Sequence, residues 1–243
     1  QALTTNTSGA QNTAVGMNSL GLVTSGGTNT AVGSNALTAV TTSADNTAVG
    51  ASAGGGVTTG TANVMMGSSA GVAITTGSYN AMFGHLAGDA VTTASGITCI
   101  GNGAGTAITT GSTNTAVGSQ TLDVCTTGSG NTAMGNDAGG AITTGTYNNF
   151  FGNSAGVATT TASHVLGIGA SALVANTTGT QNVAVGNYSL DACTTGNYNT
   201  ALGVNAGGAL TTGTNTVFIG TNAGVSQTTG YNNVIVGYNA GDS

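Results

Sequence analysis

Apolar and polar positions recur along this chain in a pattern that repeats at every seventeenth residue. Each repeat closes on a glycine, from Gly16 and Gly33 through to Gly237, and no repeat carries an insertion or a deletion. A fixed short period is typical of a solenoid, in which each repeat forms one coil. The pattern therefore predicts an all-β fold, a β-solenoid (parallel β-roll) of fourteen 17-residue coils.

Positions within a coil are numbered from this closing glycine, so that position −1 precedes it and position +1 follows it. Position −1 is large and apolar in every repeat, and position −3 is mostly Thr or Val. Side chains on a strand alternate between two faces, so these positions share one face, which we expect to line the coil interior. At position −1 the predicted coil core comprises Val15, Val32, Val49, Met66, Phe83, Ile100, Val117, Met134, Phe151, Ile168, Val185, Leu202, Ile219 and Val236.

Position −2 lies between these two positions and points to the opposite face of the strand. It holds mostly Ala, with a few larger apolar residues, where a soluble single-chain solenoid would carry polar ones. A continuous apolar stripe on an outer face marks a protein interface, so we expect this face to pack against sister chains. The predicted inter-chain interface includes Ala14, Ala31, Ala48, Met65, Met82, Cys99, Phe150, Phe218 and Ile235.

The rest of the coil also has fixed columns. Position −4 is usually Asn, and such a column predicts a ladder of amide hydrogen bonds from coil to coil. Position +7 is mostly Val, Ile or Leu, which indicates a second inward column. A Thr-Thr pair and usually a glycine follow, as in Thr58-Thr59-Gly60. Each coil is thus predicted to form two short β segments joined by glycine turns.

The composition excludes several classes of partner. The chain has no Lys or Arg and a net charge of −6, so nothing is present to neutralise phosphates, and we expect neither nucleic acid nor membrane as a partner. The unbroken register predicts one solenoid domain over residues 1–243. Gln1 is not an initiator Met and both ends fall inside a coil, so we expect a fragment or processed part of a longer fibre.

Catalytic chemistry has little support in the sequence. The carboxylates that share a column, Asp89, Asp123, Asp191 and Asp242, stand two to four coils apart, roughly 10 to 20 Å, too far for a catalytic pair. His85 and His164 occupy different columns without Cys or carboxylates at metal-ligand spacing, which favours surface stacking. We therefore expect no catalytic, metal-binding or cofactor-binding residues, and no enzyme.

The three cysteines read as small buried side chains rather than as a disulfide framework. Cys125 and Cys193 share a column but stand four coils apart, roughly 19 Å, well beyond disulfide reach. Cys99 lies in the predicted interface column, where copies from sister chains would meet.

The pentapeptide Asn12-Thr13-Ala14-Val15-Gly16, the Asn-Ala-Gly or Asn-Ser-Leu that follows such pentapeptides, and the Thr-Thr-Gly spacer resemble the repeats of bacteriophage tail-fibre shafts. They are also similar to the left-handed β-roll head repeats of trimeric autotransporter adhesins. The resemblance covers essentially the whole chain. It implies three chains packed side by side around a common axis, at the surface of a virion or cell. The chain shows no coiled-coil stalk and no receptor-binding tip, so a glycan receptor would bind through parts outside it.

These observations favour an extracellular structural fibre or adhesin shaft, a homotrimeric rod that acts as a rigid spacer for attachment. One alternative is a self-assembling extracellular filament, in which open terminal coils stack end to end. A second alternative is an ice-binding protein that uses the threonine ladder. Adjacent residues on a strand point to opposite faces, so a Thr-Thr pair supplies only one outward file. Light scattering distinguishes the first two, and thermal hysteresis tests the third.

Overall fold

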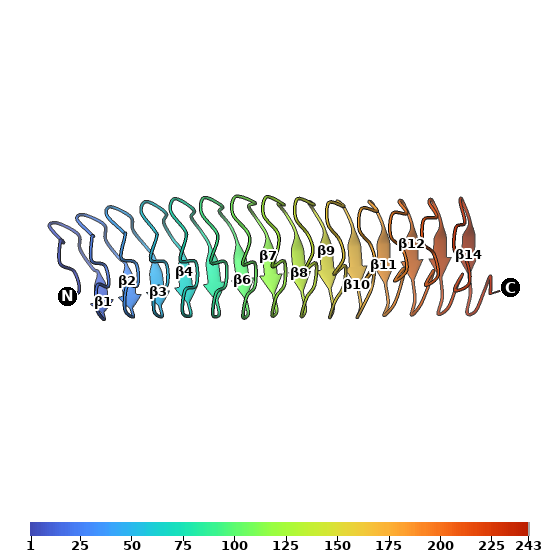
Figure 1. Cartoon of the computed structure of the whole chain (residues 1–243), viewed down its shortest axis with the longest axis horizontal. Coiled ribbons are helices and arrows are strands. Elements are labelled where there is room, and N and C mark those ends of the chain that lie inside the picture. The colour runs from blue at the N-terminus through green and yellow to red at the C-terminus, as the bar shows by residue number, and fades with distance from the viewer. Residues whose placement is uncertain (243) are drawn as a thin grey trace. The chain divides into compact units, whose positions relative to one another are not determined.

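The structure, a computed structural model that describes residues 1–242, is the predicted parallel β-solenoid. Strands and turns account for all the regular structure of these residues, and no helix occurs among them. The chain divides into two compact units, Gln1–Thr127 and Gly128–Ser243, and the period of the repeats is the same in both (Figure 1). That the repeats form one domain stays a prediction.

Each coil contributes one strand of three residues, which spans positions −3 to −1. The strands of unit 1 are β1 (Thr13–Val15), β2 (Thr30–Val32), β3 (Thr47–Val49), β4 (Val64–Met66), β5 (Ala81–Phe83), β6 (Thr98–Ile100) and β7 (Thr115–Val117). Those of unit 2 are β8 (Thr132–Met134), β9 (Asn149–Phe151), β10 (Leu166–Ile168), β11 (Val183–Val185), β12 (Thr200–Leu202), β13 (Val217–Ile219) and β14 (Val234–Val236).

Within each unit, consecutive strands pair in parallel, and paired residues lie one repeat apart. Thr13 pairs with Thr30 and Ala14 with Ala31 in unit 1, and Val217 pairs with Val234 in unit 2. Each column of the sequence therefore stacks on itself. The closing glycine follows every strand directly, and at Gly33 its φ of 140° lies in the region that favours glycine.

The inside and the outside of the strand are the reverse of the prediction. Position −2 is fully buried within the coil in every inner strand. The predicted inter-chain interface is therefore wrong, because these side chains fill the chain's own core and only the first and last of them are half-buried: Ala14, Ala31, Ala48, Met65, Met82, Cys99, Phe150, Phe218 and Ile235.

Position −1 faces solvent and not the core. Met66 and Ile100 are each 41% exposed, and Val236 is 61% exposed. The predicted coil core is therefore wrong, because none of its side chains is buried: Val15, Val32, Val49, Met66, Phe83, Ile100, Val117, Met134, Phe151, Ile168, Val185, Leu202, Ile219 and Val236. Alternation correctly separated the two faces, but the size of the side chains pointed to the wrong one.

The physical reason is the narrow interior of so short a coil. Two columns, positions −2 and +4, compete for the same space. In coils where position +4 is Leu, as at Leu37 and Leu122, position −2 is Ala or Gly. Where position −2 is large, position +4 of the same coil is Gly: a Cβ at Gly71 would lie 3.0 Å from Met65 Cγ, and one at Gly88 would lie 2.8 Å from Met82 Cε. Where both positions are small, a side chain of the next coil fills the space, since a Cβ at Gly54 would lie 2.7 Å from Met65 Cε. The core is thus close-packed across neighbouring coils.

The second inward column was predicted correctly. Position +7 is fully buried at Val23, Val40, Val57, Ile74, Val91, Ile108, Cys125, Ile142 and Leu210. It packs in the interior together with positions −2, +3 and +4, where the side chains are fully buried throughout the inner coils. The core of each unit is therefore a set of stacked columns, and every coil contributes to each of them.

The predicted asparagine ladder is present and buried. Asn46 Nδ2 donates to Asn29 Oδ1 at 3.2 Å, and Asn63 Nδ2 donates to Asn46 Oδ1 at 3.0 Å. Asn63 Nδ2 also donates to the Gly77 carbonyl at 2.9 Å, so each amide ties its own coil to the coils on both sides. Buried polar groups cost free energy unless they are paired, and here the stacking itself pairs them.

Candidate interaction surfaces

The described residues 1–242 contain no pocket and no cluster of His, Cys, Asp or Glu that could hold a metal ion. This part of the chain also has no helix long and apolar enough to cross a membrane. Three outer surfaces of the described residues are regular: the outward face of the strands, the threonine corner, and the file of residues at position +12.

The outward face of the strands, positions −3 and −1, is named the strand face. In unit 1 it alternates Thr with Val in β1 to β3, then carries larger side chains, among them Met66, Phe83 and Ile100. In unit 2 it is more apolar, because Leu166, Val183 and Val217 replace Thr at position −3. A large apolar side chain therefore stands on the outside in every coil of both units.

No charged side chain lies on the strand face of the described residues. The carboxylates occupy positions +2, +5 and +12, and the two histidines occupy positions +1 and +12. Soluble proteins rarely leave contiguous apolar surface of this kind uncovered, and such patches mark sites of protein association. An apolar column thus stands on the outside at position −1, not at position −2 as expected, and its role as an interface stays a prediction.

The order of side chains on the strand face repeats after four coils. Met66, Phe83, Ile100 and Val117 in unit 1 recur as Met134, Phe151, Ile168 and Val185 in unit 2, each four coils later. Buried positions follow the same longer period, as Cys125 and Cys193 and the pair Ile97 and Val165 show. Prediction from the period of one coil missed this longer repeat. Comparing residues four coils apart identifies it.

The Thr-Thr-Gly segment forms a corner of the coil. The backbone N–H groups of Thr58, Thr59 and Gly60 all donate to the carbonyl of Thr75, at 3.0 to 3.2 Å. The first threonine is half-buried, and the Thr58 hydroxyl donates to the same carbonyl at 3.0 Å. The second, Thr59, is exposed. One exposed threonine in nearly every coil gives a single file along a corner, as expected, but the segment is a bend and not the second β segment that was predicted.

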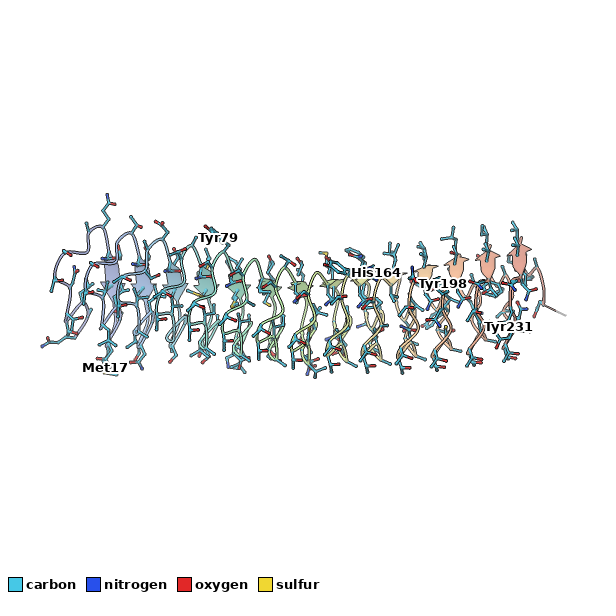
Figure 2. All side chains as sticks on the ribbon, turned by 90° about the horizontal axis from the view of Figure 1, so that it is seen from above. Met17, Tyr79, His164, Tyr198 and Tyr231 are labelled. Atoms are coloured by element: carbon cyan, nitrogen blue, oxygen red, sulfur yellow. The ribbon has the colours of Figure 1, made fainter. Side chains whose placement is uncertain are left out.

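Aromatic side chains collect at position +12, which has a positive φ. The Tyr147 and His164 rings stack with centroids 5.4 Å apart and an interplanar angle of 29°. The stacking predicted for His164 is therefore confirmed. His85 differs, because its Nδ1 lies 3.2 Å from Asn102 Nδ2 in a side-chain hydrogen bond. Figure 2 shows Tyr79 and His164 projecting from their coils.

Two carboxyl groups and two thiols of the described residues have raised pKa values. Burial raises the pKa of Asp89 and Asp191, and hydrogen bonds from backbone N–H groups offset part of that rise. All three cysteines are buried and none forms a disulfide, as expected from their columns. Burial raises the pKa of Cys99 to about 12 and that of Cys193 to about 11. Cys99 lies in the chain's own core, so its predicted place between sister chains is wrong.

Comparison of the chain with protein-family models, with curated proteins and with solved structures finds no match.

Proposed function

We propose that this chain is a segment of an extracellular structural fibre, a rigid spacer in which copies lie side by side through their strand faces. The observation that carries the proposal is the strand face itself, which is uncharged, faces outward and carries a large apolar side chain at position −1 in every coil. The extracellular setting and an assembly of three chains come from the resemblance to tail-fibre and adhesin repeats.

The area of the strand face is sufficient for a stable interface. A strand of three residues is about 10 Å long and neighbouring strands lie about 4.8 Å apart, so seven coils present roughly 330 Å². Both units of two copies would together bury on the order of 1,300 Å², which reaches the range of specific protein interfaces. Since the face has no charge, this association would depend on apolar burial and would weaken little with added salt.

The coil-to-coil ladders suit a spacer. Each buried asparagine pairs with its neighbours, and the corner threonine hydroxyls bond to the next coil, as Thr75 does to the Thr92 carbonyl at 3.2 Å. A segment held by such ladders has few unpaired backbone groups, which favours resistance to local unfolding. The lack of Lys and Arg also removes every trypsin site from the chain.

The test is the native mass by light scattering, measured at two concentrations with a reductant present. We expect a stable mass of several chains, three if the resemblance holds. The variant Met66→Asp with Met134→Asp places charges on the strand face of both units and should lower that mass toward one chain. The matched control is Tyr79→Asp, which changes a side chain that is 72% exposed at position +12 and should leave the mass unchanged.

Two results would overturn this proposal. A wild-type monomer at both concentrations would leave the strand face uncovered and would reopen the ice-binding alternative. A mass that rises continuously with concentration, and is insensitive to the Asp variant, would favour end-to-end filaments instead. Circular dichroism of the variants checks that the fold is retained, and position −1 should tolerate Asp because it faces outward.

A further inference from the structure

One corner of the coils in unit 2 carries a run of exposed rings and amides. Position +12 is an exposed aromatic or amide residue in five consecutive coils, and in the next coil a tyrosine is exposed one residue earlier, at position +11. The three tyrosines of this run are 57 to 60% exposed, and Figure 2 labels two of them together with the histidine. The run is named the aromatic file and comprises Tyr147, His164, Gln181, Tyr198, Asn215 and Tyr231.

The fold does not require rings at these positions. Whereas the strand face repeats after four coils, position +12 departs from that repeat, since Gly96 and Gly130 give way four coils later to His164 and Tyr198. The backbone at position +12 is left-handed, with a φ of 69° at Gly130 and 59° at Tyr198. Glycine enters this region freely, but bulky residues such as tyrosine rarely do. Residues held in such conformations cluster at functional sites, so these rings point to a role beyond folding.

The first rings of the file are held in place by their neighbours. A Cβ at Gly130 would lie 2.8 Å from Tyr147 Cδ1, so the Tyr147 ring rests against the bare backbone of the preceding coil. The His164 ring stacks on Tyr147 with centroids 5.4 Å apart. Further along the file, Tyr198 stands between the amide residues Gln181 and Asn215. The file thus offers rings that are fixed in advance, which lowers the entropy cost of binding, and hydrogen-bonding amides between them.

The chemistry of the file selects an uncharged polymer of rings. Aromatic side chains stack on nucleobases, but a chain with no Lys or Arg and a net charge of −6 repels phosphates. Proline-rich peptides bind in aromatic-lined grooves, and the residues that the structure describes contain no pocket. Sugars suit an open surface, because a pyranose presents an apolar C–H face to an aromatic ring and hydroxyl groups to neighbouring amides.

We propose that the aromatic file binds an extended, uncharged, β-linked polysaccharide that runs along the direction in which the coils stack. Neighbouring coils lie about 4.8 Å apart, close to the length of one pyranose unit in an extended chain. Successive sugars therefore stay in step with the coils, and each meets a ring or an amide over a file roughly 24 Å long. The resemblance to adhesin repeats placed a glycan site outside this chain, whereas the aromatic file lies within it. The proposal does not depend on what covers the strand face.

Isothermal titration calorimetry of the whole chain with cellohexaose and chitohexaose, two extended β-linked oligosaccharides, tests the proposal. Tyr198→Asn removes a ring from the file, and the backbone accepts Asn, because Asn215 holds the same position in the next coil with a φ of 57°. The affinity should fall by about tenfold or more, as expected for the loss of one stacked ring. Tyr198→Phe keeps the ring and should bind like wild type.

The matched control is Tyr79→Asn, which removes an exposed ring at position +12 of unit 1. The same position holds Ala62 and Gly96 in the coils on either side, so Tyr79 belongs to no file of rings. This variant should leave the affinity unchanged. Maltohexaose, whose α-linked chain curls away from a straight file, should bind more weakly than the β-linked probes, and circular dichroism checks that each variant is folded.

Binding of either β-linked probe that is lost in Tyr198→Asn and kept in Tyr79→Asn supports the proposal. It is overturned if neither probe binds at millimolar concentration, if the two Asn variants lose affinity equally, or if maltohexaose binds as well as the β-linked probes. Binding of decaproline without binding of any oligosaccharide would assign the file to proline-rich peptides instead. The native mass is measured separately, so a monomeric chain that binds cellohexaose overturns the fibre proposal and leaves this one standing.

Discussion

A glycine at position +4 sets how large a side chain can enter the coil interior. At Gly156 an added Cβ would overlap the ring of Phe150, and the residue has a φ of 59°. Both the overlap and the left-handed backbone oppose any larger residue at this position.

Gly156→Ala should lower the free energy of unfolding by about 3 kcal/mol or more, because overpacking costs about 1–3 kcal/mol and a left-handed backbone about 1–2 kcal/mol. Gly103→Ala is the matched control, since its φ is 64° but the nearest atom to its Cβ would be Thr106 Cγ2 at 3.7 Å. The free energy of unfolding of Gly103→Ala should fall only by the cost of the left-handed backbone, about 1–2 kcal/mol. Equal losses for the two variants, measured by denaturant unfolding, would mean that Phe150 does not fill this space.

The buried asparagines are the most strongly bonded side chains of the coil. Asn63→Ala removes the donors to Gly77 and Asn46 and the acceptor of the Asn80 N–H, which lies 3.0 Å away. Because buried groups are left unpaired, we expect a loss of about 3 kcal/mol in the free energy of unfolding. The control is Asn102→Ala, whose exposed amide bonds to His85 Nδ1 at 3.2 Å and should contribute less than about 0.5 kcal/mol.

Asp191 gives the fold a definite pH dependence. Burial raises its pKa above the ordinary value of 3.8, so folding disfavours the ionised carboxylate. Its unfavourable contribution is absent below the unfolded pKa and fully present above the folded pKa. Asp191→Asn should therefore unfold at a higher temperature than wild type at neutral pH, and the difference should vanish as the pH falls below 3.8. Asp45→Asn, at an exposed carboxylate, is the control.

At the level of the element, one whole coil is an exchangeable unit. Thr30–Gly33 has the same sequence as Thr47–Gly50. Deleting residues 34–50 therefore joins Gly33 to Ala51 and keeps every column in place.

This deletion should leave the β-sheet circular dichroism per residue unchanged and lower the free energy of unfolding only slightly. Solenoid coils contact mainly their neighbours, so the loss of one coil removes one repeat and no distant contact. Deleting residues 34–49 instead shifts all later columns by one position against the earlier ones and should destabilise unit 1 strongly. Similar stabilities for the two deletions would show that column register does not hold the fold.

The strands and their register follow from the sequence because a column that recurs once in each coil can stack only on itself. The choice between the inner and the outer face does not follow from alternation, which is symmetric. Their size favours a place in the core for Met66 and Phe83, but the interior of these coils is already filled by Met65 and Met82. The inverse relation between positions −2 and +4, seen at Phe150 with Gly156 and at Ala116 with Leu122, is the sequence signal that identifies the true interior.

At the level of the whole chain, the site is a repeated surface and not a single constellation of residues. The sequence correctly predicted that an apolar column would stand on the outside in every coil, but placed it one residue too early. What covers the strand face does not follow from the columns, because their spacing reports only how the coils of one chain stack. The four-coil repeat in both units means that whatever covers Met66 and Phe83 in unit 1 finds the same side chains in unit 2.

The buried cysteines make local opening of the coils detectable by thiol chemistry. Cys99 and Cys125 lie in unit 1 and Cys193 lies in unit 2, and all three are shielded from solvent. A thiol with its pKa raised to about 11 or 12, as at Cys193 and Cys99, is almost entirely protonated at neutral pH, so it reacts only when a coil opens. The rate at which these thiols are chemically modified therefore reports how often the surrounding coils open locally, and each unit contains at least one such thiol.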